Sequence, residues 1–304
     1  MMATVIIAFV LGYIAIVCEH PLKLNKAASA LITGVVCWTI YILQNNDPEF
    51  AGKQLIGHLG EISSILFFLL GAMTIVELID SHGGFDIITR QINTSSTKRL
   101  LWLFTILTFF LSALLDNLTT AIVMTSLSSK ILSEKEDKLW FAAMIVIAAN
   151  AGGAWSPLGD VTTTMLWIGG QVSAFQIVKQ LFLPGMVVCI IPAAIVAARF
   201  KNKKLMKQLV KERTAKEKRE GKIILFAGIG FLIFVPVFKT LTHLPPFMGM
   251  LLALGLFWIL ITFIHKNKDA EIARRFGVTS ALQRIDTQSI LFFLGILLSI
   301  TALQ

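Results

Sequence analysis

Two acidic residues lie in the middle of long apolar stretches of this 304-residue chain. Asp116 falls within residues 111–124 and Asp160 within residues 147–164, and both are surrounded by amides, hydroxyls and small residues. A carboxylate at membrane depth is costly, and membrane proteins keep such residues mainly where ions or protons move. The two stretches therefore predict a site that binds a cation or a proton.

The first polar cluster is expected at a turn between two helices. Carboxylate, amide and hydroxyl oxygens suit Na⁺ or H₃O⁺, and helix ends at such a turn add free backbone carbonyls. The candidate residues of this cluster are Ser112, Asp116, Asn117, Thr119 and Thr120. In the alternative interpretation, Asn117 and Thr119 cap the second helix and Asp116 adds to that cap.

The second cluster surrounds a predicted break in a helix. Its polar candidates are Asn150, Ser156, Asp160, Thr162 and Thr163. Proline removes a backbone donor and glycine permits unusual dihedral angles. The residues expected to serve the broken backbone are therefore Gly152, Gly153, Pro157 and Gly159. Two carboxylates near one cavity raise each other's proton affinity by repulsion, so a cation and protons would compete for one site.

Four further polar residues could form an ion-access or pH-sensing group: Glu61, Glu77, Asp80 and His82. For the last three, the alternative is a polar helix end at the membrane interface. For Glu61, the alternative is an acid at a helix N-terminus, where the helix dipole favours negative charge. His265 is expected in a solvated loop.

The elements that must position these residues are membrane helices. Hydrophobic residues make up 56% of the chain and charged residues 15%, whereas a soluble domain carries about 25% charged residues. Apolar runs of about 17–22 residues recur, which is the length needed to cross ~30 Å of hydrocarbon in a lipid bilayer. The chain is therefore predicted to be an all-α polytopic membrane protein. Helices are expected over residues 3–17, 26–43, 62–79, 181–198, 223–238, 247–264 and 289–303, with a short amphipathic segment over 86–93.

Residues 99–132 are expected to form a re-entrant helical hairpin. A single helix of that length would be about 50 Å long, far more than a bilayer requires. Two half-length helices that meet near Asp116 fit better, provided that their bent backbone is buried or faces a water-filled cavity. Residues 139–168 are expected to form a broken transmembrane helix, and residues 44–60 an acidic loop.

The charges of the loops predict the orientation. Eleven of the 27 lysines and arginines lie between residues 199 and 222, and cytoplasmic loops of membrane proteins concentrate such residues. The positive-inside rule then places the N-terminus outside, in the periplasm, only if 99–132 is a hairpin rather than a single crossing. A basic segment could also bind anionic lipid or RNA, but the topology explains the charge without a nucleic acid partner.

An internal repeat predicts a two-fold architecture. The sequence Ser-Ile-Leu-Phe-Phe-Leu occurs at residues 64–69 and 289–294, three positions after Glu61 and Asp286. With the topology above, the two copies are antiparallel, as in inverted-repeat secondary transporters. We expect three parts: a first repeat over 1–199, a basic cytoplasmic linker over 200–222 and an incomplete second inverted repeat over 223–304. Within the first repeat we expect scaffold helices over 1–98, the hairpin over 99–132, the broken helix over 139–168 and a helix over 181–198. We expect either that the chain is a fragment of a longer transporter or that another chain supplies the missing half.

Two motifs resemble the signatures of NhaD-type Na⁺/H⁺ antiporters, which belong to the ion transporter superfamily. They are Ser-Ala-Leu-Leu-Asp-Asn-Leu-Thr-Thr at residues 112–120 and Asn-Ala-Gly-Gly-Ala-Trp-Ser-Pro-Leu-Gly-Asp-Val-Thr-Thr at residues 150–163. Residues 70–85 are also similar to the family, and the resemblance covers essentially the whole chain. The departure is at the end, where the family's second Asp-Asn hairpin and second broken helix have no counterpart.

The resemblance implies exchange of Na⁺, and of Li⁺, for protons at alkaline pH across the bacterial inner membrane, without a cofactor. It also implies a homodimer built from a scaffold domain and a transport domain. Asp116 and Asp160 would bind the Na⁺. The implied cation path is lined by Ser112, Asp116, Asn117, Asn150, Asp160, Thr162 and Thr163.

Three alternatives stay open. A Na⁺-coupled carboxylate transporter of the same superfamily is disfavoured because the carboxylate of Asp116 would repel a bound anion. A membrane-embedded aspartyl protease would need Tyr-Asp and Gly-x-Gly-Asp motifs, which the sequence lacks. The third alternative is a non-transporting fragment. The sequence contains no P-loop, HExxH, GxSxG or paired-cysteine motif, so enzyme chemistry is not expected.

Overall fold

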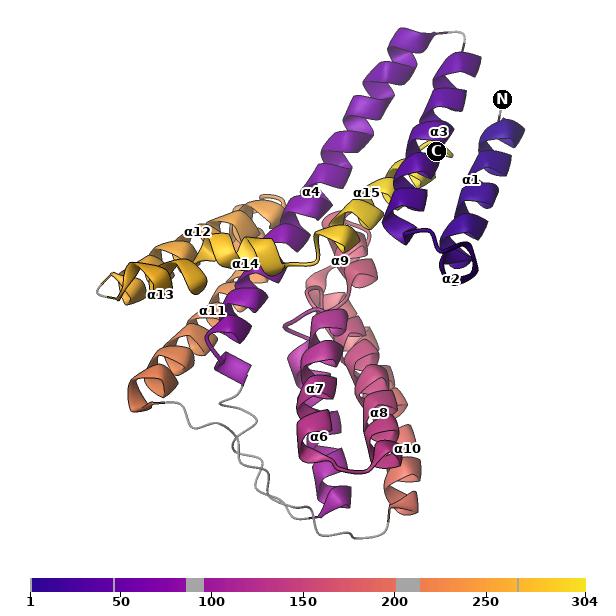
Figure 1. Ribbon diagram of the computed structural model, residues 1–304. Helices are drawn as coiled ribbons and strands as arrows, with labels where there is room; N and C mark the ends of the chain where they lie inside the picture. Colours follow the sequence, from indigo (N-terminus) through magenta and orange to yellow (C-terminus); the bar gives the residue numbers. More distant parts are fainter. Residues whose placement is uncertain (1, 46, 86–95, 201–213, 267) are drawn as a thin grey trace. The chain divides into compact units, whose positions relative to one another are not determined.

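The computed structural model describes the whole chain except residues 1, 46, 86–95, 201–213 and 267 (Figure 1). All regular elements of this described part are helices, as predicted. They form two compact units, one of residues 1–71 with 284–304 and one of residues 72–283. The predicted amphipathic segment over 86–93 lies outside the described residues.

Five of the described helices are long and apolar enough to cross a membrane. They are α3 (Lys26–Gln44), α4 (Pro48–Ser81), α10 (Ala174–Arg199), α11 (Ala215–Thr242) and α12 (Pro246–His265). In α11 the candidate membrane span is Glu217–Thr242. The prediction of an all-α polytopic membrane protein is confirmed.

In the first unit, α3 is the central helix. Both α1 (Met2–Val17) and α15 (Thr287–Thr301) pack against it, and the short α2 (Glu19–Leu22) joins α1 to α3. α3 and α15 approach so closely that a Cβ on Gly295 would lie 2.4 Å from the backbone of Ala30. The indole of Trp38 donates a hydrogen bond of 2.9 Å to the carbonyl of Leu298, which fixes the two helices to each other.

Helix α4 begins fourteen residues earlier than predicted, at Pro48 instead of residue 62. Proline is favoured in the first turn of a helix, and Asp47 Oδ1 accepts the backbone N–H of Phe50 at 3.0 Å, as an N-cap does. Most of the predicted acidic loop over 44–60 is therefore helical. Glu61 lies inside α4, so its interpretation as an acid at a helix N-terminus is wrong.

In the second unit, α8 (Lys135–Ala154) packs against α6 (Thr97–Ser112), α7 (Asn117–Ile131) and α10. Figure 1 shows α6 and α7 side by side, with the chain reversing direction between them. The short α9 (Val161–Ile168) follows α8 after a gap of six residues. The predicted helical hairpin and the predicted helix break are therefore both present.

The second unit also contains α11 packed against α12, followed by α13 (Ala270–Arg275) and α14 (Val278–Arg284). α11 starts eight residues earlier than predicted. Thr214 and Glu217 cap it reciprocally, because each side chain accepts the backbone N–H of the other residue. A capping box thus extends the helix into the predicted basic linker.

Both copies of the repeated sequence lie in the first unit, 64–69 in α4 and 289–294 in α15. Figure 1 shows the chain running in opposite directions along these two helices. The division of the chain into inverted repeats stays a prediction.

Candidate cation site

The turn between α6 and α7 lies against the break between α8 and α9. The hydroxyl of Ser112 is buried and donates a hydrogen bond of 2.6 Å to the carbonyl of Ala149. A Cβ on Gly152 would lie 2.1 Å from the carbonyl oxygen of Phe109, and one on Gly159 would lie 2.1 Å from that of Ser112. Backbone touches backbone here, so only glycine fits at these two positions. The fold brings the two polar stretches together.

Asp116 is the N-cap of α7. Its Oδ1 accepts the backbone N–H of Thr119 at 2.8 Å. Its Oδ2 is buried and has no hydrogen-bond partner among the described residues. The capping alternative is therefore correct in part, with Asp116 itself as the cap, and it accounts for only one of the two carboxylate oxygens.

Asp160 is the N-cap of α9. Its Oδ2 accepts the backbone N–H groups of Thr162 at 3.1 Å and Thr163 at 3.3 Å, and the hydroxyl of Thr162 donates to the same oxygen. Its Oδ1 accepts a hydrogen bond of 3.1 Å from Nδ2 of Asn117. Both oxygens of Asp160 therefore accept hydrogen bonds, whereas only one oxygen of Asp116 does so among the described residues.

Asn117 connects the hairpin to the broken helix. Its Nδ2 donates to Oδ1 of Asn150 at 2.9 Å as well as to Oδ1 of Asp160 at 3.1 Å. Asn150 in turn donates from Nδ2 to the carbonyl of Val146, at 2.8 Å, and is held in place by its own helix. The sequence identified these residues as candidates, but it did not show that one amide joins them.

The cluster offers oxygen ligands of the kind that hard cations prefer. They are Asp116 Oδ2, the carboxylate of Asp160 and the hydroxyl of Thr120. This hydroxyl lies one turn after Asp116 and is buried, with no hydrogen-bond partner in the described part of the chain. Both carboxylates lie at helix N-termini, where negative charge is favoured. Groups of this kind are ligands for a hard cation or acceptors for a proton.

The helix break begins after Ala154, three residues later than predicted, because Gly152, Gly153 and Ala154 remain in α8. A Cβ on Gly153 would lie 2.4 Å from the carbonyl oxygen of Gly159, so the chain folds back closely on itself within the break. At Gly152, Gly153 and Gly159 the backbone passes too close to another part of the backbone to leave room for a side chain.

The remaining predicted residues shape the break itself. Ser156 is buried, and its hydroxyl accepts the backbone N–H of Leu158 at 3.2 Å. The carbonyl of Pro157 accepts the hydroxyl of Thr164 at 2.8 Å. These contacts hold the loop that presents Asp160 to Asn117.

The four residues of the predicted ion-access group lie on or directly after α4, Glu61 in the first unit and the other three in the second. Glu61 is exposed on the part of α4 in the first unit, where one of its carboxylate oxygens lies 3.8 Å from Nδ1 of His58. Glu77 is half-buried and Asp80 is exposed. His82, directly after α4, is 8% exposed and faces an unpredicted partner.

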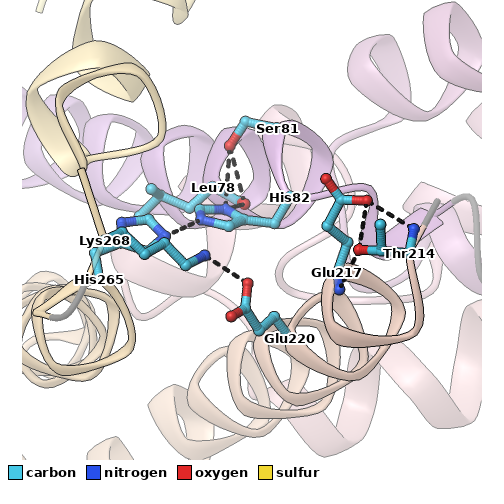
Figure 2. A network of polar contacts seen from close by, with 8 residues as sticks. All are labelled: Leu78, Ser81, His82, Thr214, Glu217, Glu220, His265 and Lys268. Atoms are coloured by element: carbon cyan, nitrogen blue, oxygen red, sulfur yellow. Dashed lines mark hydrogen bonds and ion pairs between the residues drawn. The ribbon is translucent and has the colours of Figure 1, made fainter. Parts of the chain in front are cut away.

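Figure 2 shows that partner: the rings of His82 and His265 point at each other, with their Nε2 atoms 3.1 Å apart. His82 Nδ1 donates to the carbonyl of Leu78 at 2.6 Å. A neutral His82 then has a lone pair on Nε2, so Nε2 of His265 must carry the hydrogen between them. The expectation of a solvated His265 is wrong, because this residue is the last of α12 and is 5% exposed.

Sequence reasoning missed one charged residue near α9. Lys239, in the apolar helix α11, donates from Nζ to the carbonyl of Trp167 at 2.9 Å. The same nitrogen lies 4.6 Å from the centre of the indole ring of Trp167. A single lysine in an apolar run was visible in the sequence, but its partner 72 positions away was not.

Comparison with known proteins places this site in context. Residues 4–304 match a protein-family model described as citrate transporter. The chain is similar to sodium/proton antiporter 1 of Arabidopsis thaliana, with 47% identity over 97% of this chain and 51% of the relative. It is also similar to sodium/proton antiporter 2 of the same plant, with 44% identity over 97% of this chain and 70% of the relative.

A bacterial relative is similar over the same length. The Na⁺/H⁺ antiporter NhaD of Vibrio cholerae is 29% identical over 98% of this chain and 68% of its own length. The chain spans about half the length of the first of these three relatives and about two thirds of the other two.

Proposed function

The chain belongs to the transporter family described as citrate transporter, and we propose that within this family it exchanges Na⁺ for H⁺ across a membrane. The observation that carries the proposal is the geometry at the two helix breaks. Asp116 keeps one buried carboxylate oxygen without a hydrogen-bond partner among the described residues, beside a network that joins Asn117 to Asp160. The similarity to the sodium/proton antiporters of Arabidopsis thaliana and Vibrio cholerae supports the same activity.

The two carboxylates have different parts in this proposal. Asp116 binds either Na⁺ or a proton at its free Oδ2, while its Oδ1 keeps the cap of α7. Asp160, whose oxygens are both engaged, supplies charge and a fixed position. Binding of Na⁺ and binding of a proton at Asp116 exclude each other, and this competition couples the two fluxes.

Several finer features belong to the same proposal. Li⁺ is a second substrate, because it is a small, hard monovalent cation that suits the same oxygen ligands. The protein is a homodimer in the bacterial inner membrane, with its N-terminus outside. The relatives that support this activity come from both plants and bacteria.

The test is exchange in everted membrane vesicles that contain the protein at its full natural length. A pH gradient is formed by respiration, and its dissipation is followed after addition of Na⁺, Li⁺ or K⁺. We expect Na⁺ and Li⁺ to dissipate the gradient in the wild type, and Asp116→Asn and Asp160→Asn to abolish the response. Asparagine caps helices as well as aspartate does, so these variants remove the charge and keep the fold.

Asp286→Asn is the matched control. Asp286 caps α15 through the backbone N–H of Ser289 at 3.1 Å, is exposed and lies outside the cluster. This variant should exchange Na⁺ at the wild-type rate. Normal exchange in Asp116→Asn would contradict the proposal.

The description of the matching family favours one second candidate, transport of a carboxylate together with Na⁺. Two carboxylates beside the candidate site disfavour a bound anion, because like charges repel. Citrate and succinate are therefore added to the same vesicles. Dissipation of the pH gradient by either acid, without a response to Na⁺ alone, would favour the second candidate.

A further inference from the structure

Lys239 is a charged residue in an apolar helix and has no part in the function proposed above. It lies three residues before the end of α11, and a lysine near a helix end commonly extends towards the membrane surface. Lys239 is half-buried instead, and its ammonium lies against Trp167. A lysine held in this way requires an explanation in terms of its partner.

The partner is the last turn of α9. The carbonyl of Trp167 accepts Nζ of Lys239 at 2.9 Å and also accepts the backbone N–H of Gly170 at 3.2 Å. The last carbonyls of a helix carry partial negative charge, and a cation placed there stabilises the helix. The indole of Trp167, 2% exposed, adds a cation–π contact.

The other end of α9 carries Asp160. The helix has eight residues and rises about 12 Å, so it is too short to be stable alone. An anionic cap at its N-terminus and an ammonium at its C-terminus complement both ends of its dipole. The position of Asp160 therefore depends on what holds the far end of α9.

We propose that Lys239 is a positioning residue of the cation site: it fixes α9 from α11 so that Asp160 stays within hydrogen-bond distance of Asn117. This inference rests on the proposed function. It adds that α11 belongs to the machinery of the site. Loss of the ammonium loosens α9, displaces Asp160 and weakens cation binding.

The first test is the kinetics of Na⁺-dependent exchange by the full-length protein in everted vesicles. Lys239→Met keeps the length of the side chain and removes the charge, and we expect the apparent KM for Na⁺ to rise about tenfold, with little change in maximal rate. Lys239→Arg keeps a cation that can donate to the carbonyl and stack on the indole, and it should restore the KM. Lys222→Met, at an exposed position of the same helix, should leave the KM unchanged.

The second test does not depend on transport. Amide hydrogen exchange over residues 161–168 should be at least about tenfold faster in Lys239→Met than in the wild type, Lys239→Arg or Lys222→Met. An unchanged KM and unchanged hydrogen exchange in a correctly inserted Lys239→Met would overturn the inference. If the wild type shows no Na⁺-dependent exchange, the proposed function fails, while hydrogen exchange still decides whether Lys239 holds α9.

Discussion

Each carboxylate of the candidate site serves both the fold and the chemistry. Asp116 and Asp160 cap short helices, a role that any aspartate at these positions could perform. Only Asp116 keeps a buried oxygen that the protein leaves without a hydrogen bond in the described part of the chain. A buried acceptor without a partner costs about 1–3 kcal/mol, and under the proposed function a bound cation or proton would offset this cost.

The histidine pair predicts a pH dependence of stability at the residue scale. Burial is the main cause that lowers the pKa of His82 from 6.5 to about 4. The charges of His265 on α12 and of Lys268 lower it further, whereas Glu220 on α11 and the bond to Leu78 oppose the shift. Below pH 6.5 the unfolded chain then binds a proton that the folded chain does not, so stability falls as the pH falls, and the loss levels off below about pH 4.

Thermal unfolding in detergent between pH 8 and pH 4 measures this effect, which should amount to something on the order of 3 kcal/mol. We expect His82→Gln to flatten the pH dependence between pH 6.5 and 4. His20→Gln, at an exposed histidine, should keep the wild-type dependence. An unchanged slope in His82→Gln would show that other groups cause it.

At the scale of elements, close backbone contact holds the hairpin against α8. In Gly152→Ala, the new methyl group would lie 2.1 Å from the carbonyl of Phe109, and neither backbone can yield cheaply. We expect a loss of at least about 1–3 kcal/mol of stability. We also expect loss of Na⁺ exchange, because Asn150 moves away from Asn117 when the helices separate.

Gly255→Ala provides the matched control for this prediction. Gly255 lies in α12, and a Cβ there would meet nothing within 4 Å. This variant should be about 0.4–1 kcal/mol more stable than the wild type, because alanine restricts the unfolded chain. Unfolding in detergent and vesicle exchange measure both variants, and equal behaviour of the two would contradict a role for close packing at Gly152.

Features that depend on neighbouring residues could be predicted from the sequence, whereas contacts between residues far apart in the chain could not. The hairpin, the helix break and most polar residues of the site come from local patterns, and the structure contains them. The early start of α4 at Asp47 and Pro48 was also encoded locally, but the polar composition of 44–60 favoured a loop. The pair of His82 and His265 spans 183 positions, and no local pattern could reveal which helix ends meet.

At the scale of the whole molecule, the hairpin decides on which side of the membrane every later segment lies. α6 has 16 residues and α7 has 15, so each rises about 24 Å or less. Neither reaches across ~30 Å of hydrocarbon, and they meet at a polar turn packed against α8. We predict that the pair enters and leaves on one side, in which case the positive-inside rule places residues 199–222 on the side opposite to the N-terminus.

Cysteine labelling in bacterial cells tests this topology. In a background that carries Cys18→Ala, Cys37→Ala and Cys189→Ala, Glu49→Cys and Lys218→Cys each introduce one thiol at an exposed position. An impermeant maleimide should label Glu49→Cys in intact cells and Lys218→Cys only in everted vesicles, and both should react after detergent is added. Labelling of Lys218→Cys in intact cells would place the basic segment outside. The hairpin would then count as one full crossing, and α8, α9 and α10 would all have the opposite orientation.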